Sequence, residues 1–169
     1  MIFGKKRADS RKKTYLYLHN ETLLTMKPPA IHEMTAYDPT RHTAICRLLQ
    51  QLTTAPVTLD EAALRTLLDH PTSHLYLLEE EGQVVGMLTL GIYPAPTGTK
   101  GWIEDVVVME GQRGRGYGRQ LVAHAIEAAR QEGVRHLMLT SNPQRTAANR
   151  LYQTMGFEQR ETNCYRMNL

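Results

Sequence analysis

Cysteine is scarce in this sequence, which has two, Cys46 and Cys164, among its 169 residues. In a chain without a secretion signal, two cysteines are expected to be reduced core or surface residues and not a disulfide. Neither cysteine has metal-ligand spacing, and the seven histidines form no HExxH motif and no clustered ligand set. The sequence therefore predicts no metal.

Long apolar runs are also missing. No stretch approaches the roughly 20 apolar residues that span a bilayer. The most apolar N-terminal segment, "TYLYLHNETLL", is interrupted by His19, Asn20 and Glu21, so it lacks the continuous hydrophobic region of a signal peptide. We expect a soluble, cytoplasmic protein with no membrane partner.

The globular part of the chain lacks an excess of positive charge. The net charge is +3, but residues 1–30 hold seven Lys/Arg against two Asp/Glu, and the rest of the chain holds 13 against 15. We predict a flexible, solvated basic arm over residues 1–30 and one folded domain over residues 31–169. Nucleic-acid binding through the arm is an alternative that predicts strongly salt-dependent binding. The slightly acidic domain gives it little support.

Hydrophobic periodicity predicts a single mixed α/β domain. A helix is expected over residues 58–70, with Thr58 as N-cap and Glu61 completing a capping box. Alternation predicts a hairpin that turns at Glu81-Gly82. The predicted elements are a strand at 31–36, helices at 38–52 and 58–70, strands at 73–80, 83–93 and 101–110, a helix at 115–133, a buried-type strand at 134–141, a helix at 142–156, and strand material at 157–168.

The segment "QRGRGYGRQ", residues 112–120, combines glycines and arginines between a predicted strand and a predicted helix. Such a turn gathers backbone N–H groups at the positive end of a helix dipole, which suits phosphate oxygens. Glycines remove the Cβ atoms that would hold an anion away, and arginines add charge-assisted hydrogen bonds. The segment lacks the Gly-Lys-Ser/Thr ending of a Walker loop and the third glycine of a Rossmann fingerprint. The alternative is a surface loop that binds nothing.

Two segments resemble the signatures of the GNAT family of N-acetyltransferases. The first, "VVVMEGQRGRGYGRQLVAHAI", carries the pattern Gln/Arg-x-x-Gly-x-Gly/Ala at Arg113, Gly116 and Gly118. The second, "AANRLYQTMGF", places Leu-Tyr on a helix ahead of Gly-Phe. The resemblance covers residues from about 31 to 168. It implies a GNAT-type mixed, mostly antiparallel sheet flanked by helices in a single domain, and it implies the use of acetyl-CoA.

The same resemblance assigns the coenzyme contacts. It places the pyrophosphate on the glycine-rich loop and the pantetheine along the preceding strand, paired to free backbone groups as an added strand would be. The implied coenzyme-binding residues are Val106, Val107, Val108, Arg113, Gly114, Arg115, Gly116, Tyr117, Gly118, Arg119 and Asn149. Many relatives have an asparagine seven residues before the tyrosine of the second signature, where this chain has Arg145. Asn149 is equally well explained as an exposed helical residue.

Acetyl transfer to an amine benefits from a base, because an amine with a pKa of about 10.4 is mostly protonated at pH 7. By resemblance, Glu104 and Asp105 lie at the acceptor site. Glu104 would act as the base or as an anchor for the ammonium group, and Asp105 would assist it. Strand alternation would send them to opposite faces. The alternative is a structural ion pair or a solubility device. Tyr152 is the expected donor to the leaving thiolate, although its helical spacing alone indicates a core residue.

The sequence thus predicts an N-acetyltransferase that acts by direct attack of a primary amine on acetyl-CoA. The alternative is a coenzyme-A-binding sensor or regulatory domain without turnover. The acidic pair favours a cationic acceptor, either a small molecule or a protein amine, and the sequence does not choose between them. The family resemblance leaves a homodimer open.

Overall fold

The structure is a computed structural model that describes residues 27–52 and 57–169. Most of the predicted basic arm, residues 1–26, lies outside the described residues, so that prediction stays untested. Within the described ranges, no helix combines the length and the apolar character that a membrane crossing requires.

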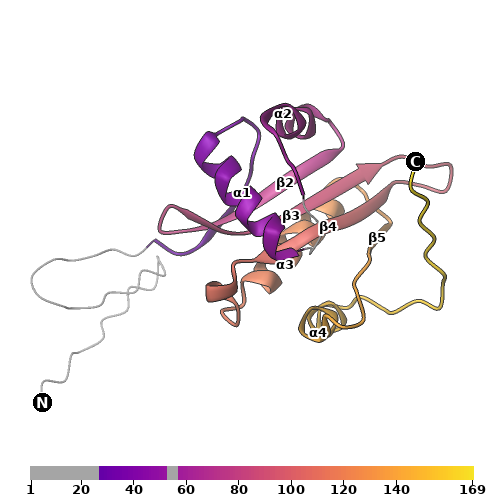
Figure 1. The fold of residues 1–169 in the computed structure, drawn as a ribbon. Coiled ribbons are helices and arrows are strands. Elements are labelled where there is room, and N and C mark those ends of the chain that lie inside the picture. Colours follow the sequence, from indigo (N-terminus) through magenta and orange to yellow (C-terminus); the bar gives the residue numbers. More distant parts are fainter. Residues whose placement is uncertain (1–26, 53–56) are drawn as a thin grey trace, which may run out of the picture.

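The order of the elements is the predicted one up to residue 156 (Figure 1). The chain forms β1 (Ala30–Glu33), α1 (Pro39–Leu52), α2 (Glu61–Asp69), β2 (Ser73–Glu80), β3 (Gln83–Tyr93), β4 (Lys100–Val108), the short 3₁₀ helix η1 (Glu110–Gln112), α3 (Tyr117–Gln131), β5 (His136–Leu139) and α4 (Thr146–Thr154).

The described strands form a five-stranded sheet in the order β1-β2-β3-β4-β5. Neighbouring strands are antiparallel except β4 and β5, which are parallel. The β2–β3 hairpin turns at Glu81 and Gly82, whose φ angles of 51° and 78° suit a tight turn that follows the strand twist. The predicted mixed, mostly antiparallel sheet is confirmed.

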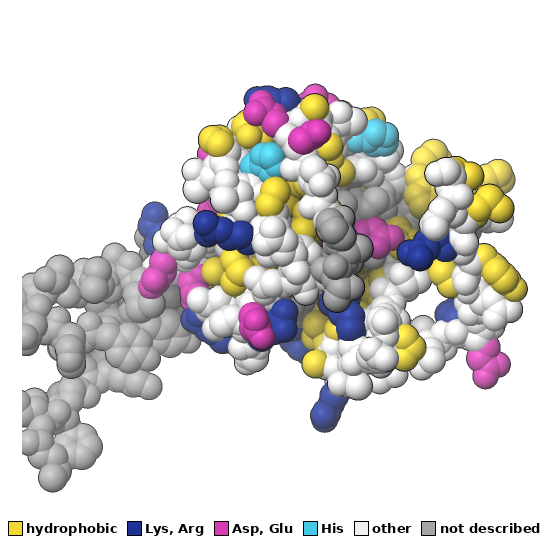
Figure 2. Space-filling view, in the orientation of Figure 1, with side chains coloured by type: hydrophobic (Ala, Val, Ile, Leu, Met, Phe, Trp, Pro, Cys, Tyr) yellow, Lys and Arg dark blue, Asp and Glu magenta, His cyan; other side chains and the backbone are white. Residues whose placement is uncertain are grey.

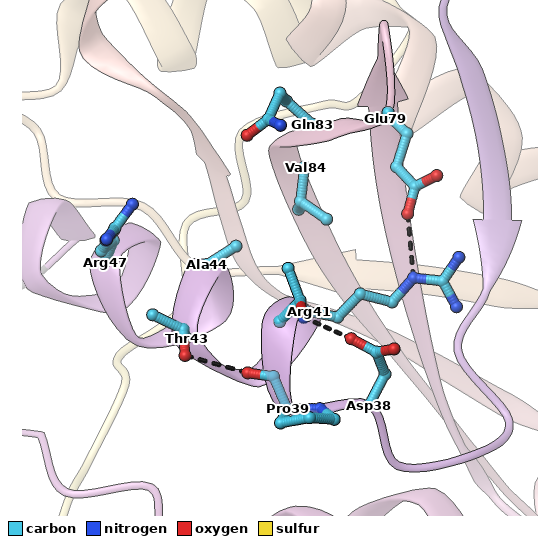
Figure 3. Close-up of a pocket in the computed structure, with 11 residues that line it drawn as sticks. Asp38, Pro39, Arg41, Thr43, Ala44, Arg47, Glu79, Gln83 and Val84 are labelled. Atoms are coloured by element: carbon cyan, nitrogen blue, oxygen red, sulfur yellow. Dashed lines mark hydrogen bonds and ion pairs between the residues drawn. The ribbon is translucent and has the colours of Figure 1, made fainter.

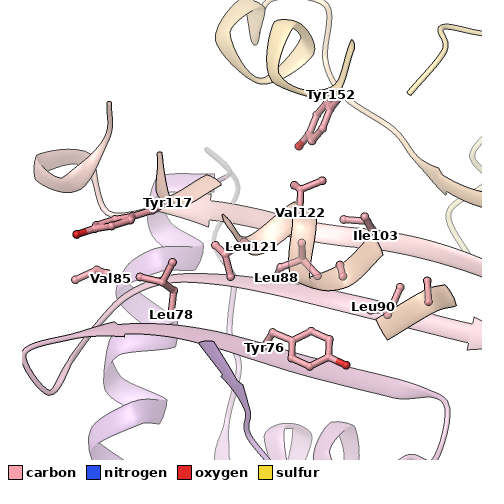
Figure 4. Close-up of a cluster of buried hydrophobic side chains, with 12 residues drawn as sticks. Tyr76, Leu78, Val85, Leu88, Leu90, Ile103, Tyr117, Leu121, Val122 and Tyr152 are labelled. Atoms are coloured by element: carbon pink, nitrogen blue, oxygen red, sulfur yellow. The ribbon is translucent and has the colours of Figure 1, made fainter. Parts of the chain in front are cut away.

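Two apolar clusters hold the helices against the two faces of the sheet. Leu121 and Val122 of α3 pack with Leu88 and Leu90 of β3 on one face (Figure 4). Residues of α1 and α2, among them Leu48 and Leu64, form the second cluster with β2, β3 and β4. The sheet is therefore covered on both sides, and β4 supplies residues to both clusters.

Four local predictions were wrong. The last helix begins at Thr146 and not at residue 142. The N-cap of α2 is Asp60 rather than Thr58, because the Asp60 carboxylate accepts a hydrogen bond from the Ala63 N–H at 2.8 Å. Strand β5 alternates exposed and half-buried residues and is not of the buried type. Residues 157–169, all of which are described, contain no strand, and Tyr165 and Met167 are 87% and 82% exposed.

Candidate functional site

The two parallel strands, β4 and the edge strand β5, separate partway along β4. Pairing between β4 and β5 ends at Ile103 and Leu139, whereas β4 continues to Val108 along β3. Beyond that point, β4 has no partner strand on its β5 side among the described residues. The predicted pantetheine-binding residues, Val106, Val107 and Val108, lie on this open stretch. No described strand pairs with this stretch on that side, and the Val106 and Val108 carbonyls accept hydrogen bonds from side chains only, those of Arg145 and Arg113. An extended ligand could be added to such an edge in place of these side-chain contacts.

A β-bulge interrupts β4 at the start of the open stretch. Residues Met87 and Thr89 of β3 face Val107 and Glu104, so β4 contains one extra residue in this interval. The backbone accommodates this extra residue at Asp105, which has a φ of 53°. Bulges of this kind change the direction of the side chains near them. The predicted alternation of Glu104 and Asp105 to opposite faces was therefore wrong, because simple alternation ends at the bulge.

Both carboxylates reach one cavity of about 180 Å³ at the opening between β4 and β5. Its lining consists of Leu52, Ile103, Glu104, Asp105, Val106, Leu139, Thr140, Arg145 and Tyr152. Partial removal of water raises the pKa of Glu104, and the neighbouring Asp105 charge raises it further. Burial also raises the pKa of Asp105. A carboxylate with a raised pKa is a better proton acceptor than an ordinary glutamate.

Tyr152 projects from α4 toward the sheet (Figure 4) and also lines this cavity. Its ring belongs to the α3-side cluster, and the side chain is only 5% exposed. Burial raises its pKa, while the Arg145 charge opposes that effect. The structural and the functional interpretations of Tyr152 are thus compatible, because the ring packs in the core and the residue still borders the cavity.

The glycine-rich loop presents free backbone donors at the start of α3. In the part of the chain that the structure describes, the N–H groups of residues 114–119 make no backbone hydrogen bond. Gly114 and Gly116 have φ angles of 78° and 82°, and a Cβ built on either would meet no atom within 4 Å. Gly116 is the N-cap of α3. The loop therefore offers several N–H groups to an anion without a side chain in the way.

The three loop arginines already contact protein atoms. Arg113 donates from Nε to the Val108 carbonyl at 3.2 Å, and Arg119 donates to Thr154 Oγ1 at 2.7 Å. Arg115 forms a two-point ion pair with Glu80 of β2, at 2.5 and 2.6 Å, and also contacts Gln112. Each arginine thus ties the loop to a neighbouring part of the structure.

Tyr117 is buried, and its hydroxyl donates to the same Glu80 carboxylate at 2.5 Å. Burial and this hydrogen bond raise the pKa of Tyr117 to about 12. Its phenol points into the structure, so only its backbone N–H is available to a ligand at the loop. Glu80 was missed by sequence reasoning, because no local pattern indicates a contact between β2 and the loop.

Asn149 faces the turn before α4. Its Nδ2 donates to the carbonyls of Asn142 and Pro143, at 2.9 and 3.4 Å. The neighbouring Arg145 reaches β4, where Nη2 donates to the Val106 carbonyl at 3.1 Å. Arg145 therefore lies at the open stretch, in the position where many relatives have an asparagine. The presence of Arg145 in place of the asparagine of the signature was the feature of the sequence that could have indicated its position at the site.

A larger cavity of about 570 Å³ lies between α1 and the β2–β3 hairpin (Figure 3). Its lining includes one direct ion pair, between Arg41 and Glu79. Arg41 Nε donates to Glu79 at 2.9 Å, and the Arg41 backbone N–H donates to Asp38 at 2.7 Å. This cavity contains none of the predicted site residues, so the smaller one between β4 and β5 is the candidate site.

Charges of both signs are mixed over the face shown in Figure 2, without a continuous basic surface. Within residues 27–52 and 57–169, no group of three or more His, Cys, Asp or Glu residues is arranged to hold a metal ion.

Comparisons with known proteins agree with this architecture. Residues 42–157 match the model of the acetyltransferase (GNAT) family. An aminoalkylphosphonate N-acetyltransferase of Salmonella typhimurium is 34% identical over 135 residues, which cover 76% of this chain and 83% of that protein. The structure of an acetyltransferase from Trypanosoma brucei is 26% identical, with a TM-score of 0.69 over 84% of this chain and all of the other.

The fold is also shared with more distant enzymes. The structure of an aminoglycoside N-acetyltransferase in complex with CoA is 19% identical, with a TM-score of 0.68 over 89% of this chain and 99% of the other. The family match spans well over half of the chain and includes β4, the glycine-rich loop, α3 and α4. The protein therefore belongs to the GNAT family of acetyltransferases.

Proposed function

We propose that the protein transfers an acetyl group from acetyl-CoA to a primary amine by direct attack within a ternary complex. The observation that carries the proposal is the single cavity that brings Glu104 and Tyr152 together beside the open stretch of β4. Family membership supports acetyl transfer, and the relative that acts on an aminoalkylphosphonate supports a small-molecule amine.

The residues present fit acetyl-CoA. The free N–H groups of residues 114–119 suit a pyrophosphate, and the space above Gly114 and Gly116 admits it. The edge of β4 over residues 104–108 has no β5 partner and suits the amides of pantetheine, once Arg113 and Arg145 release the Val108 and Val106 carbonyls. When bound, acetyl-CoA supplies an activated thioester. The loop arginines have protein partners, so we assign the main phosphate contacts to the backbone.

Glu104 is positioned to accept the proton that the amine must lose, and Asp105 helps to hold the ammonium form. The amine nitrogen then forms a bond to the carbonyl carbon, the carbon–sulfur bond breaks with the electron pair leaving on sulfur, and the nitrogen releases its remaining extra proton to water. Tyr152 donates a hydrogen bond to the departing sulfur. Full proton transfer from Tyr152 would be uphill, because burial raises its pKa above the ordinary tyrosine value, which already exceeds the thiol pKa of about 8.5.

Direct attack is favoured over an acyl-enzyme because no cysteine of the described chain lines the cavity. Cys46 lies on α1 with its Sγ 3.8 Å from the Leu59 carbonyl, and Cys164 is exposed in the C-terminal segment. A covalent route needs a nucleophile within reach of the thioester.

The test is a thiol-release screen of amines with acetyl-CoA, using wild type, Glu104→Gln and Tyr152→Phe. We expect Glu104→Gln to lower kcat/KM by about 10²- to 10⁴-fold, as for loss of a general base. Tyr152→Phe should lower kcat by about 10- to 100-fold, as for loss of a hydrogen bond to a charged group. Tyr165→Phe, the same change at an exposed tyrosine, is the control.

Wild-type kcat/KM should also fall as the pH is lowered through the pKa of Glu104, because only its ionised form accepts a proton. Since that pKa is raised, the loss should begin at a higher pH than for an ordinary glutamate. Glu104→Gln should lack this acidic limb. Intact turnover in both variants would refute the catalytic assignment. Tight coenzyme binding without turnover of any amine would favour a sensor domain instead.

A further inference from the structure

The candidate cavity contains charges of both signs that do not neutralise one another. Glu104 and Asp105 lie on the β4 wall, and Arg145 enters from the turn before α4. Among the described residues, none of these three side chains has an oppositely charged partner within 4.0 Å. This contrasts with the larger cavity near α1, where Arg41 and Glu79 pair directly.

Arg145 is held in place with most of its donors free. Its guanidinium donates one hydrogen bond, to the Val106 carbonyl at 3.1 Å, out of the five N–H groups that an arginine carries. The turn before it is fixed by the Arg145 N–H bonded to the Asn142 carbonyl at 2.9 Å. Asn149 fixes the same turn from α4 through its bonds to Asn142 and Pro143. The free donors are therefore presented from a defined position.

The unpaired groups match a ligand that carries two charges. A simple amine would neutralise the acidic wall and leave the Arg145 donors unused. A guanidinium binds carboxylate, phosphate or phosphonate oxygens through two parallel hydrogen bonds. The cavity volume of about 180 Å³ is below the roughly 300–1,000 Å³ of sites for drug-sized ligands. Because the thioester must also reach this cavity beside Val106 and Tyr152, the remaining space suits an acceptor with a short spacer between its two charges.

We propose that the acceptor is a small zwitterion, whose amine faces Glu104 and Asp105 and whose anionic group is bound by Arg145. This inference rests on the proposed acetyl transfer and names the class of its acceptor. Arg145 is then the residue that selects zwitterions over simple amines, and Asn149 is a positioning residue that acts through Arg145.

A competing role for Arg145 follows from its contact with Val106. The Val106 carbonyl lies on the open stretch of β4, where the pantetheine is expected. If the Arg145 side chain pointed along β4, it would contact the coenzyme and not the anionic group of the acceptor. In the first role the affinity for the acceptor depends on Arg145, and in the second role the affinity for acetyl-CoA does. Measurements on each substrate therefore separate them.

The experiment compares wild type with Arg145→Gln, using 2-aminoethylphosphonate, β-alanine and O-phosphoethanolamine as zwitterions and n-propylamine as the uncharged-tail amine. We expect Arg145→Gln to raise KM for the preferred zwitterion by about 10- to 100-fold. KM for acetyl-CoA and for n-propylamine should change less than about twofold. Arg150→Gln, the same change at an exposed arginine of α4, is the matched control.

A second measurement does not depend on turnover. Calorimetry with protein saturated with CoA should detect binding of at least one zwitterion more tightly than n-propylamine, and Arg145→Gln should abolish the difference. Equal or weaker binding of every zwitterion would overturn the inference, as would a rise in KM for acetyl-CoA together with all acceptors. Zwitterion binding without acetylation would contradict the proposed function and leave the binding assignment standing.

Discussion

Among single residues, Glu80 has the most connections to the glycine-rich loop. Its carboxylate accepts hydrogen bonds from both the Arg115 guanidinium and the Tyr117 hydroxyl, and its side chain is 12% exposed. The hydrogen bonds from Tyr117 and Arg115 lower its pKa, so it is ionised throughout the physiological range. One acidic residue of β2 thus fixes the position of the loop on which the coenzyme is expected.

We predict that Glu80→Gln weakens CoA binding by about 3- to 10-fold, because the amide cannot form the two-point ion pair with Arg115. The change should appear in KM for acetyl-CoA and in calorimetry, with kcat largely preserved. Glu81→Gln, the same substitution at the exposed neighbouring residue, serves as the comparison. Tighter CoA binding by Glu80→Gln would contradict the prediction, since it would mean that Glu80 keeps Arg115 away from the phosphates.

The sequence predicted some residue roles better than others. Glu104 and Tyr152 were predicted by family resemblance, and the structure brings them to one cavity. Glu80 and the free donors of Arg145 could not be predicted, because both depend on contacts between distant segments. The shared cavity of Glu104 and Asp105 was also unpredictable, because it depends on a bulge that the local pattern does not reveal.

Among the elements, the start of α3 depends on the backbone of Gly116. Its φ of 82° lies in the left-handed region, which costs other residues about 1–2 kcal/mol. Gly111 in η1 lacks a positive φ, and a Cβ there would also meet no atom within 4 Å. The two glycines therefore differ in conformation but share an open environment.

We expect Gly116→Ala to lower the Tm by about 2–8 °C, which is the strain converted for a domain of this size. It should also weaken CoA binding, since the N–H groups at the start of α3 would shift. Gly111→Ala should change the Tm by less than about 2 °C. Thermal unfolding of both variants checks this, and equal effects would show that the backbone conformation at Gly116 is not the cause.

Elements with strong local signals were predicted well. The β2–β3 hairpin has the predicted bounds, because alternation and the Glu81-Gly82 turn both act locally. The strand expected within residues 157–168 does not form among the described residues. Strand formation requires a partner edge, and the sequence pattern alone cannot supply one.

At the scale of the whole molecule, the two apolar clusters share the central strands of one sheet. Loss of either cluster would expose the residues of β3 and β4 that the other cluster also needs. Unfolding is therefore expected to be a single cooperative transition, and a ligand that binds only the folded state should stabilise the whole domain.

CoA at about 100 times its Kd should stabilise the domain by about 2.7 kcal/mol. For a chain of this size, the Tm should rise by about 5–11 °C. Differential scanning fluorimetry measures the shift, with AMP at the same concentration as a ligand that lacks the pyrophosphate and pantetheine. No shift with CoA would contradict the coenzyme site, and with it both the transferase and the sensor interpretations.

The separation of β4 from β5 has a consequence for how acceptor preference can change. The acidic wall belongs to β4 and Arg145 follows β5, so the distance between the opposite charges depends on the width of the gap. At Gly101, below the gap, an added methyl would lie 2.8 Å from Leu137 Cδ1 and 2.9 Å from Val134 Cγ1. A larger residue there would require the side chains of Leu137, on β5, and Val134, just before it, to move. If the proposed zwitterion is the acceptor, substitutions at such uncharged positions are expected to alter the preferred distance between its two charged groups.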